Sequence, residues 1–140
     1  MNTTGLRVVI DTNVLIAMIG LASPYRPVFE SILSGELTMC ITTEILYEYQ
    51  EILTRKNGVE VADNMVQFFS IHPFVEKVEP FYHFKVIEQD PDDNKFIDCA
   101  VAASVDCIVS NDRHFSHPGL MDFPKVRVLT AEKFLEKYYD

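Results

Sequence analysis

Acidic side chains stand next to apolar stretches of this chain at several points. Asp11 comes directly after the run Leu6–Ile10, and Asp112 comes shortly after Cys107–Val109. Asp93 stands at the head of another segment rich in apolar residues. Carboxylates that gather in one place repel one another unless cations neutralise them. Such a set predicts a site for a hard divalent cation, Mg²⁺ or Mn²⁺, which takes oxygen ligands and can activate water for phosphodiester hydrolysis.

Strands that alternate with helices are needed to bring these acids together. We expect strands at Leu6–Ile10, Leu37–Ile41, Cys107–Val109 and Val126–Leu129, a further strand candidate at Phe74–Val78, and helices at Val14–Ile19, Tyr25–Leu33, Thr43–Arg55, Val61–Phe69, from Asp92 or Asp93 to Ser104, and Ala131–Tyr138. The alternation predicts an α/β fold, with a central, mostly parallel sheet covered by helices on both faces. Ligands of such sheets bind beyond the carboxyl ends of the strands, which is where the acids stand.

The helix that starts near Asp93 carries several acids, and a helical wheel separates them. Asp93 lies near the centre of the apolar stripe, so we expect it to face the sheet. Asp92 and Asp98 lie off the stripe, so we expect them to face water. The stripe is formed by Phe96, Ile97, Ala100, Val101 and Ser104.

The helix after Thr42 gives a weaker discrimination of the same kind. Glu48 lies at the margin of its apolar stripe, whereas Glu44 and Glu51 lie further round the helix. Glu48 is therefore the acid best placed to lean over the end of the sheet. The stripe is formed by Ile45, Leu46, Tyr49, Ile52 and Leu53.

Each acid taken alone also fits a structural role. The segment Asp11–Asn13 is a good turn and helix start, and so is Asp90–Asn94. The pattern of these acids as a set is what favours a metal site.

Length and composition place this chain among ordinary globular domains. With 140 residues, 48% of them apolar, we expect one domain over residues 1–140. Three cysteines without paired spacing speak against a disulfide framework, and we see neither a signal peptide nor a membrane span. We therefore expect a soluble, cytoplasmic protein. The net charge of −9 argues against binding nucleic acid by simple phosphate neutralisation.

Four segments in order resemble the motifs of the PIN-domain nucleases. The resemblance is to the branch of toxin components of toxin–antitoxin systems, the VapC-like ribonucleases. It covers the chain from Val8 to about Leu135, and Asn111 departs from the Gly or Arg that relatives often carry. The segments are Val9–Leu15, Thr42–Leu53 with Glu48-Tyr49, Asp90–Phe96 and Ile108–Asp112.

The resemblance implies a three-layer α/β/α PIN-like fold and a Mg²⁺- or Mn²⁺-dependent endoribonuclease that acts on single-stranded RNA. Asn13 and Ser110 would orient the carboxylates, and Asp98 is a possible extra acid. Water would attack the phosphate, and one carboxylate or bulk solvent would accept the proton. A cognate antitoxin and a homodimer are expected partners. The implied catalytic and metal-binding quartet is Asp11, Glu48, Asp93 and Asp112.

Basic residues near the acids are candidate contacts for RNA phosphate. Arg113 adjoins Asp112, and Lys95 lies near the start of the acid-bearing helix. Both also fit surface ion pairs, which are the commoner case.

Two other functions compete with the ribonuclease. A phosphatase of the haloacid-dehalogenase kind needs a second Asp two residues after the first, and Asn13 stands there. A non-catalytic, PIN-like scaffold that binds RNA or protein stays open, because a set of acids indicates a capacity for metal and not turnover.

Overall fold

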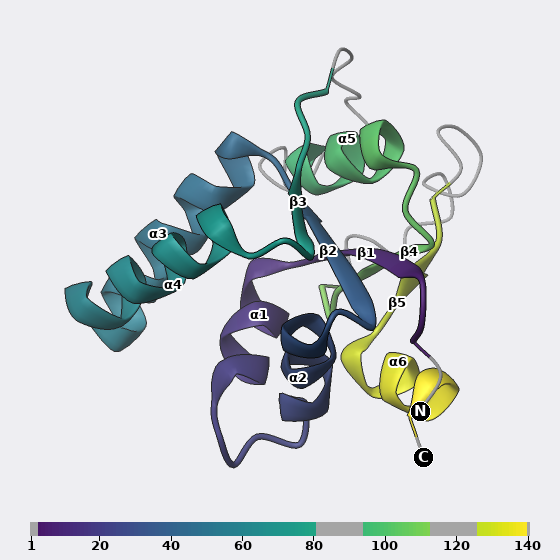
Figure 1. The fold of residues 1–140 in the computed structure, drawn as a ribbon, viewed down its shortest axis with the longest axis horizontal. Helices are drawn as coiled ribbons and strands as arrows, with labels where there is room; N and C mark the ends of the chain where they lie inside the picture. The colour runs from purple at the N-terminus through teal and green to yellow at the C-terminus, as the bar shows by residue number, and fades with distance from the viewer. Residues whose placement is uncertain (1–2, 81–93, 113–125, 140) are drawn as a thin grey trace.

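A five-stranded sheet with six helices forms the described part of the chain (Figure 1). The structure is a computed structural model, and it describes residues 3–80, 94–112 and 126–139. The elements are β1 (Leu6–Ile10), α1 (Thr12–Ile19), α2 (Arg26–Ser34), β2 (Leu37–Ile41), α3 (Thr43–Asn57), α4 (Val59–Ile71), β3 (Val75–Lys77), α5 (Asn94–Ala103), β4 (Cys107–Val109), β5 (Val128–Leu129) and α6 (Ala131–Tyr138).

The sheet is parallel throughout, with the strand order β3-β2-β1-β4-β5. Val8 is paired with Met39 of β2 on one side and with Cys107 of β4 on the other. The strand order reverses at β1, because the chain runs outward from β1 to β3 and then returns to β4 on the opposite side. A crevice for ligands forms at such a reversal, beyond the carboxyl ends of the two central strands.

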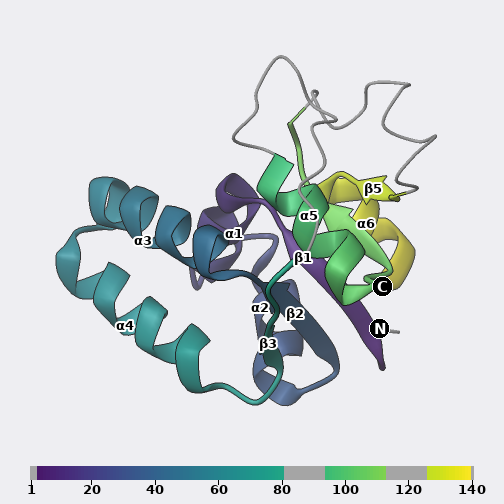
Figure 2. The same cartoon turned by 90° about the horizontal axis from the view of Figure 1, so that it is seen from above.

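Helices cover both faces of the sheet, as the three-layer expectation requires. Figure 1 shows α5 on one side and α1, α2 and α6 on the other. Helices α3 and α4 form an antiparallel pair that extends away from the sheet beyond the β3 edge (Figure 2). The central strands are therefore buried on both faces, and Val8, Val9 and Ile10 are fully inaccessible to solvent.

Local sequence explains where most elements begin and end. The hydroxyl of Thr42 accepts a hydrogen bond from the Ile45 N–H and caps α3, and Thr130 caps α6 in the same way through Lys133. Gly35 ends α2 in the left-handed conformation, with φ of 87°. These caps agree with the predicted helix boundaries to within a few residues.

The structure corrects two expectations about elements. The last strand is only Val128–Leu129, shorter than the predicted Val126–Leu129. Asp98 is buried, with 5% of its surface exposed, although the helical wheel placed it in water. The reason is that α5 packs against β1, β2, β4 and α3, so most of its circumference is covered and not only one stripe. The helix ends at Ala103, and Ser104 is exposed beyond it.

Within the described ranges, no helix combines the length and the apolar character that crossing a membrane would require.

Candidate active site

Asp11 stands at the carboxyl end of β1 and opens helix α1. Its Oδ1 accepts a hydrogen bond from the Thr12 N–H at 2.8 Å, and its Oδ2 accepts one from the Ser110 hydroxyl at 2.7 Å. Only 6% of the Asp11 surface is exposed. The residue therefore caps a helix, as its place after a strand predicts, and also presents a nearly buried carboxylate at the carboxyl end of the central strand β1.

Ser110 connects the two acids that follow the central strands. It lies directly after β4 and is buried, and its Oγ accepts a hydrogen bond from the Asp112 N–H at 3.0 Å while its hydroxyl donates to Asp11. The side chain of Asn111 points elsewhere, because its Oδ1 accepts from the Ala131 N–H at 2.9 Å at the start of α6. This loop thus places Asp112 beside Asp11.

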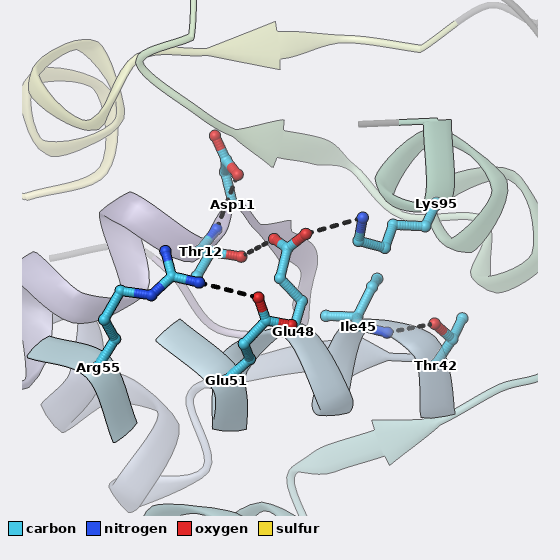
Figure 3. Close-up of polar contacts among 8 residues, drawn as sticks. All are labelled: Asp11, Thr12, Thr42, Ile45, Glu48, Glu51, Arg55 and Lys95. Atoms are coloured by element: carbon cyan, nitrogen blue, oxygen red, sulfur yellow. Dashed lines mark hydrogen bonds and ion pairs between the residues drawn. The ribbon is translucent and has the colours of Figure 1, made fainter. Parts of the chain in front are cut away.

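Glu48 of α3 lies near Asp11 at the same edge of the sheet (Figure 3). Its Oε2 accepts a hydrogen bond from the Thr12 hydroxyl, and the backbone N–H of the same threonine donates to Asp11. The neighbouring Tyr49 is fully buried and donates its hydroxyl to the carbonyl of Ile10, the residue before Asp11. Helix α3 is therefore fastened to the end of β1. Glu48 is half-buried, as its place at the stripe margin predicts.

Lys95 forms an ion pair with the other oxygen of Glu48. Its Nζ lies 2.8 Å from Glu48 Oε1, and the side chain is only 8% exposed. The sequence suggested a surface contact for this lysine, whereas the structure places it beneath the surface on α5, inside the candidate site. A contact of Lys95 with RNA phosphate stays a prediction.

The electrostatics of the site favour a positively charged ligand. Burial raises the pKa of Asp11 above its ordinary value, and the charges of Asp112 and Glu48 raise it further. The hydrogen bonds from Ser110 and from the Thr12 N–H act in the opposite direction without cancelling the rise. A cation near Asp11 would relieve both the repulsion and the cost of burying the charge.

The donor set fits a hard divalent cation by its chemistry. Asp11, Asp112 and Glu48 offer only carboxylate oxygens, and no His or Cys accompanies them in the described part of the site. However, no group of three or more such side chains already converges on one point among the residues the structure describes. Asp11, Asp112 and Glu48 are neighbours that a bound ion would have to draw together.

The predicted residues fall into three groups. Asp11, Glu48, Asp112, Ser110 and Lys95 lie together at the carboxyl edge of the sheet. Asp93 and Arg113 lie outside the described residues. Asn13 is exposed and makes no hydrogen bond with the described carboxylates, so its supporting role stays a prediction.

Thr12 and Tyr49 contact the site, although the sequence does not predict either as a site residue. The sequence pattern places Thr12 in a turn and Tyr49 in the apolar stripe of its helix. The Thr12–Glu48 contact joins residues 36 positions apart, so no local pattern reveals it. The only signal in the sequence was the adjacency of each residue to a proposed carboxylate.

The sequence itself matches a family model described as the PIN domain, over residues 7–114. The chain belongs to the PIN domain family. The match includes all four acids of the proposed quartet and both central strands of the sheet. Among curated protein sequences, none is similar enough to this PIN domain to count as a match.

Solved structures with the same fold include three from bacteria. VapBC2 from Rickettsia felis, bound to a DNA fragment from its promoter, gives a TM-score of 0.62 at 18% identity, with 89% of this PIN domain and 98% of that chain covered. DNA-bound VapBC from Salmonella typhimurium gives a TM-score of 0.58 at 16% identity, with 90% of this chain and 98% of that chain covered. VapC20 from Mycobacterium tuberculosis, a toxin that cleaves the sarcin-ricin loop, gives a TM-score of 0.56 at 12% identity, with 78% of this chain and 92% of that chain covered. At these identities the likeness establishes the fold alone.

Proposed function

We propose that this PIN domain is a metal-dependent endoribonuclease that hydrolyses phosphodiester bonds of single-stranded RNA, as the toxin of a toxin–antitoxin pair. The observation that carries the proposal is a set of three acids at the carboxyl edge of the sheet. Ser110 binds the Asp11 carboxylate and the backbone N–H of Asp112, and Thr12 binds Asp11 through its N–H and Glu48 through its hydroxyl. Buried acids that repel one another are costly unless they serve a ligand, and phosphoryl chemistry is a common use of carboxylate-held cations.

The chain contributes positioning and charge to this reaction. Asp11, Glu48 and Asp112, with Asp93 as the predicted fourth acid, would hold Mg²⁺ or Mn²⁺. The bound cation would supply charge neutralisation at the phosphate and a lowered pKa for water. Ser110 fixes the orientation of the Asp11 carboxylate, and the Thr12 hydroxyl fixes that of Glu48. One carboxylate or bulk solvent would take the proton that the attacking water loses.

The roles of two further residues belong to the proposal. Arg113 directly follows Asp112 and would contact an RNA phosphate beside the cleaved bond. Asn13 lies on the exposed first turn of α1 and would support the carboxylates once the ion and RNA are present. Their substitution by alanine should weaken cleavage without unfolding the protein.

A protein partner is part of the proposal as well. Two of the similar chains were solved as VapBC, which supports an antitoxin partner for this chain. The net charge of −9 favours a basic segment on that partner. We also propose a cytoplasmic location, and a homodimer as the state in which the toxin acts.

Cleavage of a labelled single-stranded RNA tests the proposed activity. The wild type should cleave the RNA with Mn²⁺ or Mg²⁺, and EDTA should stop the cleavage. The cleavage rate of Asp11→Asn should be lower by about 100-fold or more, because even residues that only hydrogen-bond a metal ligand commonly contribute about 10- to 100-fold to metal affinity or activity. Asp63→Asn on the exposed face of α4 is the matched control and should cleave like the wild type.

Equal cleavage by the wild type and Asp11→Asn would refute the assignment of the site. Metal-dependent RNA binding without cleavage by any variant would instead favour the non-catalytic scaffold.

A further inference from the structure

The Lys95–Glu48 ion pair is unusual because it is placed inside a group of acids proposed to hold a metal. Lysine is almost never buried without a partner, and here the partner is one of the carboxylates of the site. The pair joins α5 to α3, two elements that lie far apart in sequence (Figure 3). This buried pair is therefore not an ordinary ion pair of the surface.

Protein groups contact both oxygens of Glu48. Oε1 faces the Lys95 ammonium at 2.8 Å, and Oε2 accepts the Thr12 hydroxyl. Each carboxylate oxygen has two lone pairs, so a neutral donor such as Thr12 leaves room for a cation on the same oxygen. A bound ammonium does not leave such room, because its positive charge repels a divalent cation only a few ångströms away.

We propose that Lys95 is an internal counter-ion that occupies Glu48 while the site holds no metal and leaves Glu48 when a divalent cation binds. This inference rests on the proposed function, since it concerns the same carboxylates. It changes the predicted role of Lys95 from a contact for RNA phosphate to a residue that sets the affinity of the site for metal.

The surroundings of Lys95 suit such a displacement. Its flexible four-carbon stem lets the ammonium move while the backbone of α5 stays in place. The Nζ atom also lies 5.5 Å from the centre of the Phe96 ring, within the range of a favourable cation–π contact. An ammonium released from Glu48 would keep this contact, so its displacement need not leave it without a favourable neighbour.

Metal binding without RNA tests the inference directly. Isothermal titration with Mn²⁺ should give a tighter dissociation constant for Lys95→Met than for the wild type, by about tenfold or more, because a like charge has been removed from a partly buried site. Lys95→Gln, which also removes the charge, should behave in the same way. Lys56→Met, at the exposed end of α3, removes the same charge elsewhere and should leave the affinity within about twofold of the wild type, as expected for a distant screened charge.

A thermal readout keeps the test sound if the substitution weakens folding. Without metal, Lys95→Met should melt below the wild type, since Glu48 loses its partner. With Mn²⁺ its melting temperature should rise by more than that of the wild type, as tighter binding to the native state requires.

Unchanged or weaker Mn²⁺ affinity in both Lys95 variants would overturn the inference, because Lys95 would then support the metal-binding form of Glu48 or be irrelevant to it. If the wild type also cleaves RNA with Mn²⁺, the proposed function stands and only the role of Lys95 is wrong. If neither the wild type nor the variants bind Mn²⁺, the metal site of the proposed function fails and the inference fails with it.

Discussion

Asp11 combines an observed structural role with the chemical role proposed for it. It caps α1, pairs with Ser110 and carries a charge that its surroundings disfavour. Residues at functional sites often lower stability in this way, because the arrangement that suits the ligand is not the one that suits the empty fold.

The raised pKa of Asp11 makes a prediction about stability. A carboxyl whose pKa is higher in the folded than in the unfolded state binds its proton more readily when folded, so stability falls as the pH rises from the ordinary value through the raised one. Above both values, the ionised Asp11 destabilises the metal-free protein. Asp11→Asn should therefore raise the free energy of unfolding at pH 7 by roughly 1 kcal/mol.

Urea denaturation in metal-free buffer at pH 7 and at mildly acidic pH measures this effect. The gain of Asp11→Asn should shrink as the pH falls and the wild-type carboxyl takes up its proton. A variant that is less stable than the wild type at pH 7 would contradict the account, as would a gain that does not change with pH.

Thr12 gives a second prediction at the scale of single residues. Its buried hydroxyl donates a hydrogen bond to Glu48, while its backbone N–H donates to Asp11. Hydrogen bonds to charged groups contribute about 1.5–3 kcal/mol. Thr12→Val keeps the shape and removes the donor, so kcat for RNA cleavage should fall roughly tenfold or more. Thr12→Ser keeps the hydroxyl and should restore most of the rate. A Thr12→Val enzyme with wild-type kcat would show that this hydrogen bond is not used.

The acids of the site could be named from the sequence, but their partners could not. Asp11 directly follows β1 and Asp112 lies three residues after the end of β4, so the adjacent parallel strands bring both to one edge of the sheet. Contacts of Glu48 with Thr12 and Lys95 depend on how α3 and α5 pack at that edge. That packing involves residues distant in sequence, which no spacing rule describes.

At the scale of elements, the strands were the most predictable part. Strands β1, β2 and β4 are short, mostly apolar and largely buried runs, and their bounds agree with the prediction. The helical wheel predicted the burial of side chains correctly for α3, which has one solvent-exposed face. It was wrong for Asp98, because α5 is covered by other elements on most sides. A wheel ranks positions around one helix and does not say how many neighbours surround it.

Gly35 tests how α2 is joined to the sheet. It adopts a φ of +87°, and a Cβ there would lie 2.6 Å from Cε2 of Phe74, just before β3. Gly5 also has a positive φ, of +78°, but a Cβ there would meet nothing within 4 Å. Gly5→Ala should lower the free energy of unfolding by about 1–2 kcal/mol through backbone strain. Gly35→Ala should lower it by the same strain and by about 1–3 kcal/mol more, because the Phe74 ring must move.

The free energies of unfolding of these two variants, from urea denaturation, give the comparison. Equal losses would mean that the ring of Phe74 gives way at no cost, and that α2 and β3 are packed more loosely than the structure indicates.

At the scale of the whole molecule, the acidic surplus bears on how the proposed RNA substrate would be bound. Neutralising the four proposed ligands would still leave the chain acidic, so we expect phosphate binding through surface charge to be weak. The protein should bind a hydrolysis-resistant single-stranded RNA weakly in EDTA and distinctly more tightly with Mn²⁺. Fluorescence anisotropy of a labelled phosphorothioate RNA, whose sulfur-substituted phosphates resist attack by water, measures both affinities. Tight binding in EDTA would show that a basic surface and not the metal carries the contact.

The source of the oxygen in the cleaved RNA tests the central claim most directly. With Mn²⁺ in water enriched in ¹⁸O, mass spectrometry should find one ¹⁸O atom in the new terminal phosphate of the product, because water is the attacking group. Asp11→Asn should yield almost no such product. A product ending in a 2′,3′-cyclic phosphate, formed equally well in EDTA or by Asp11→Asn, would contradict metal-dependent hydrolysis at this site.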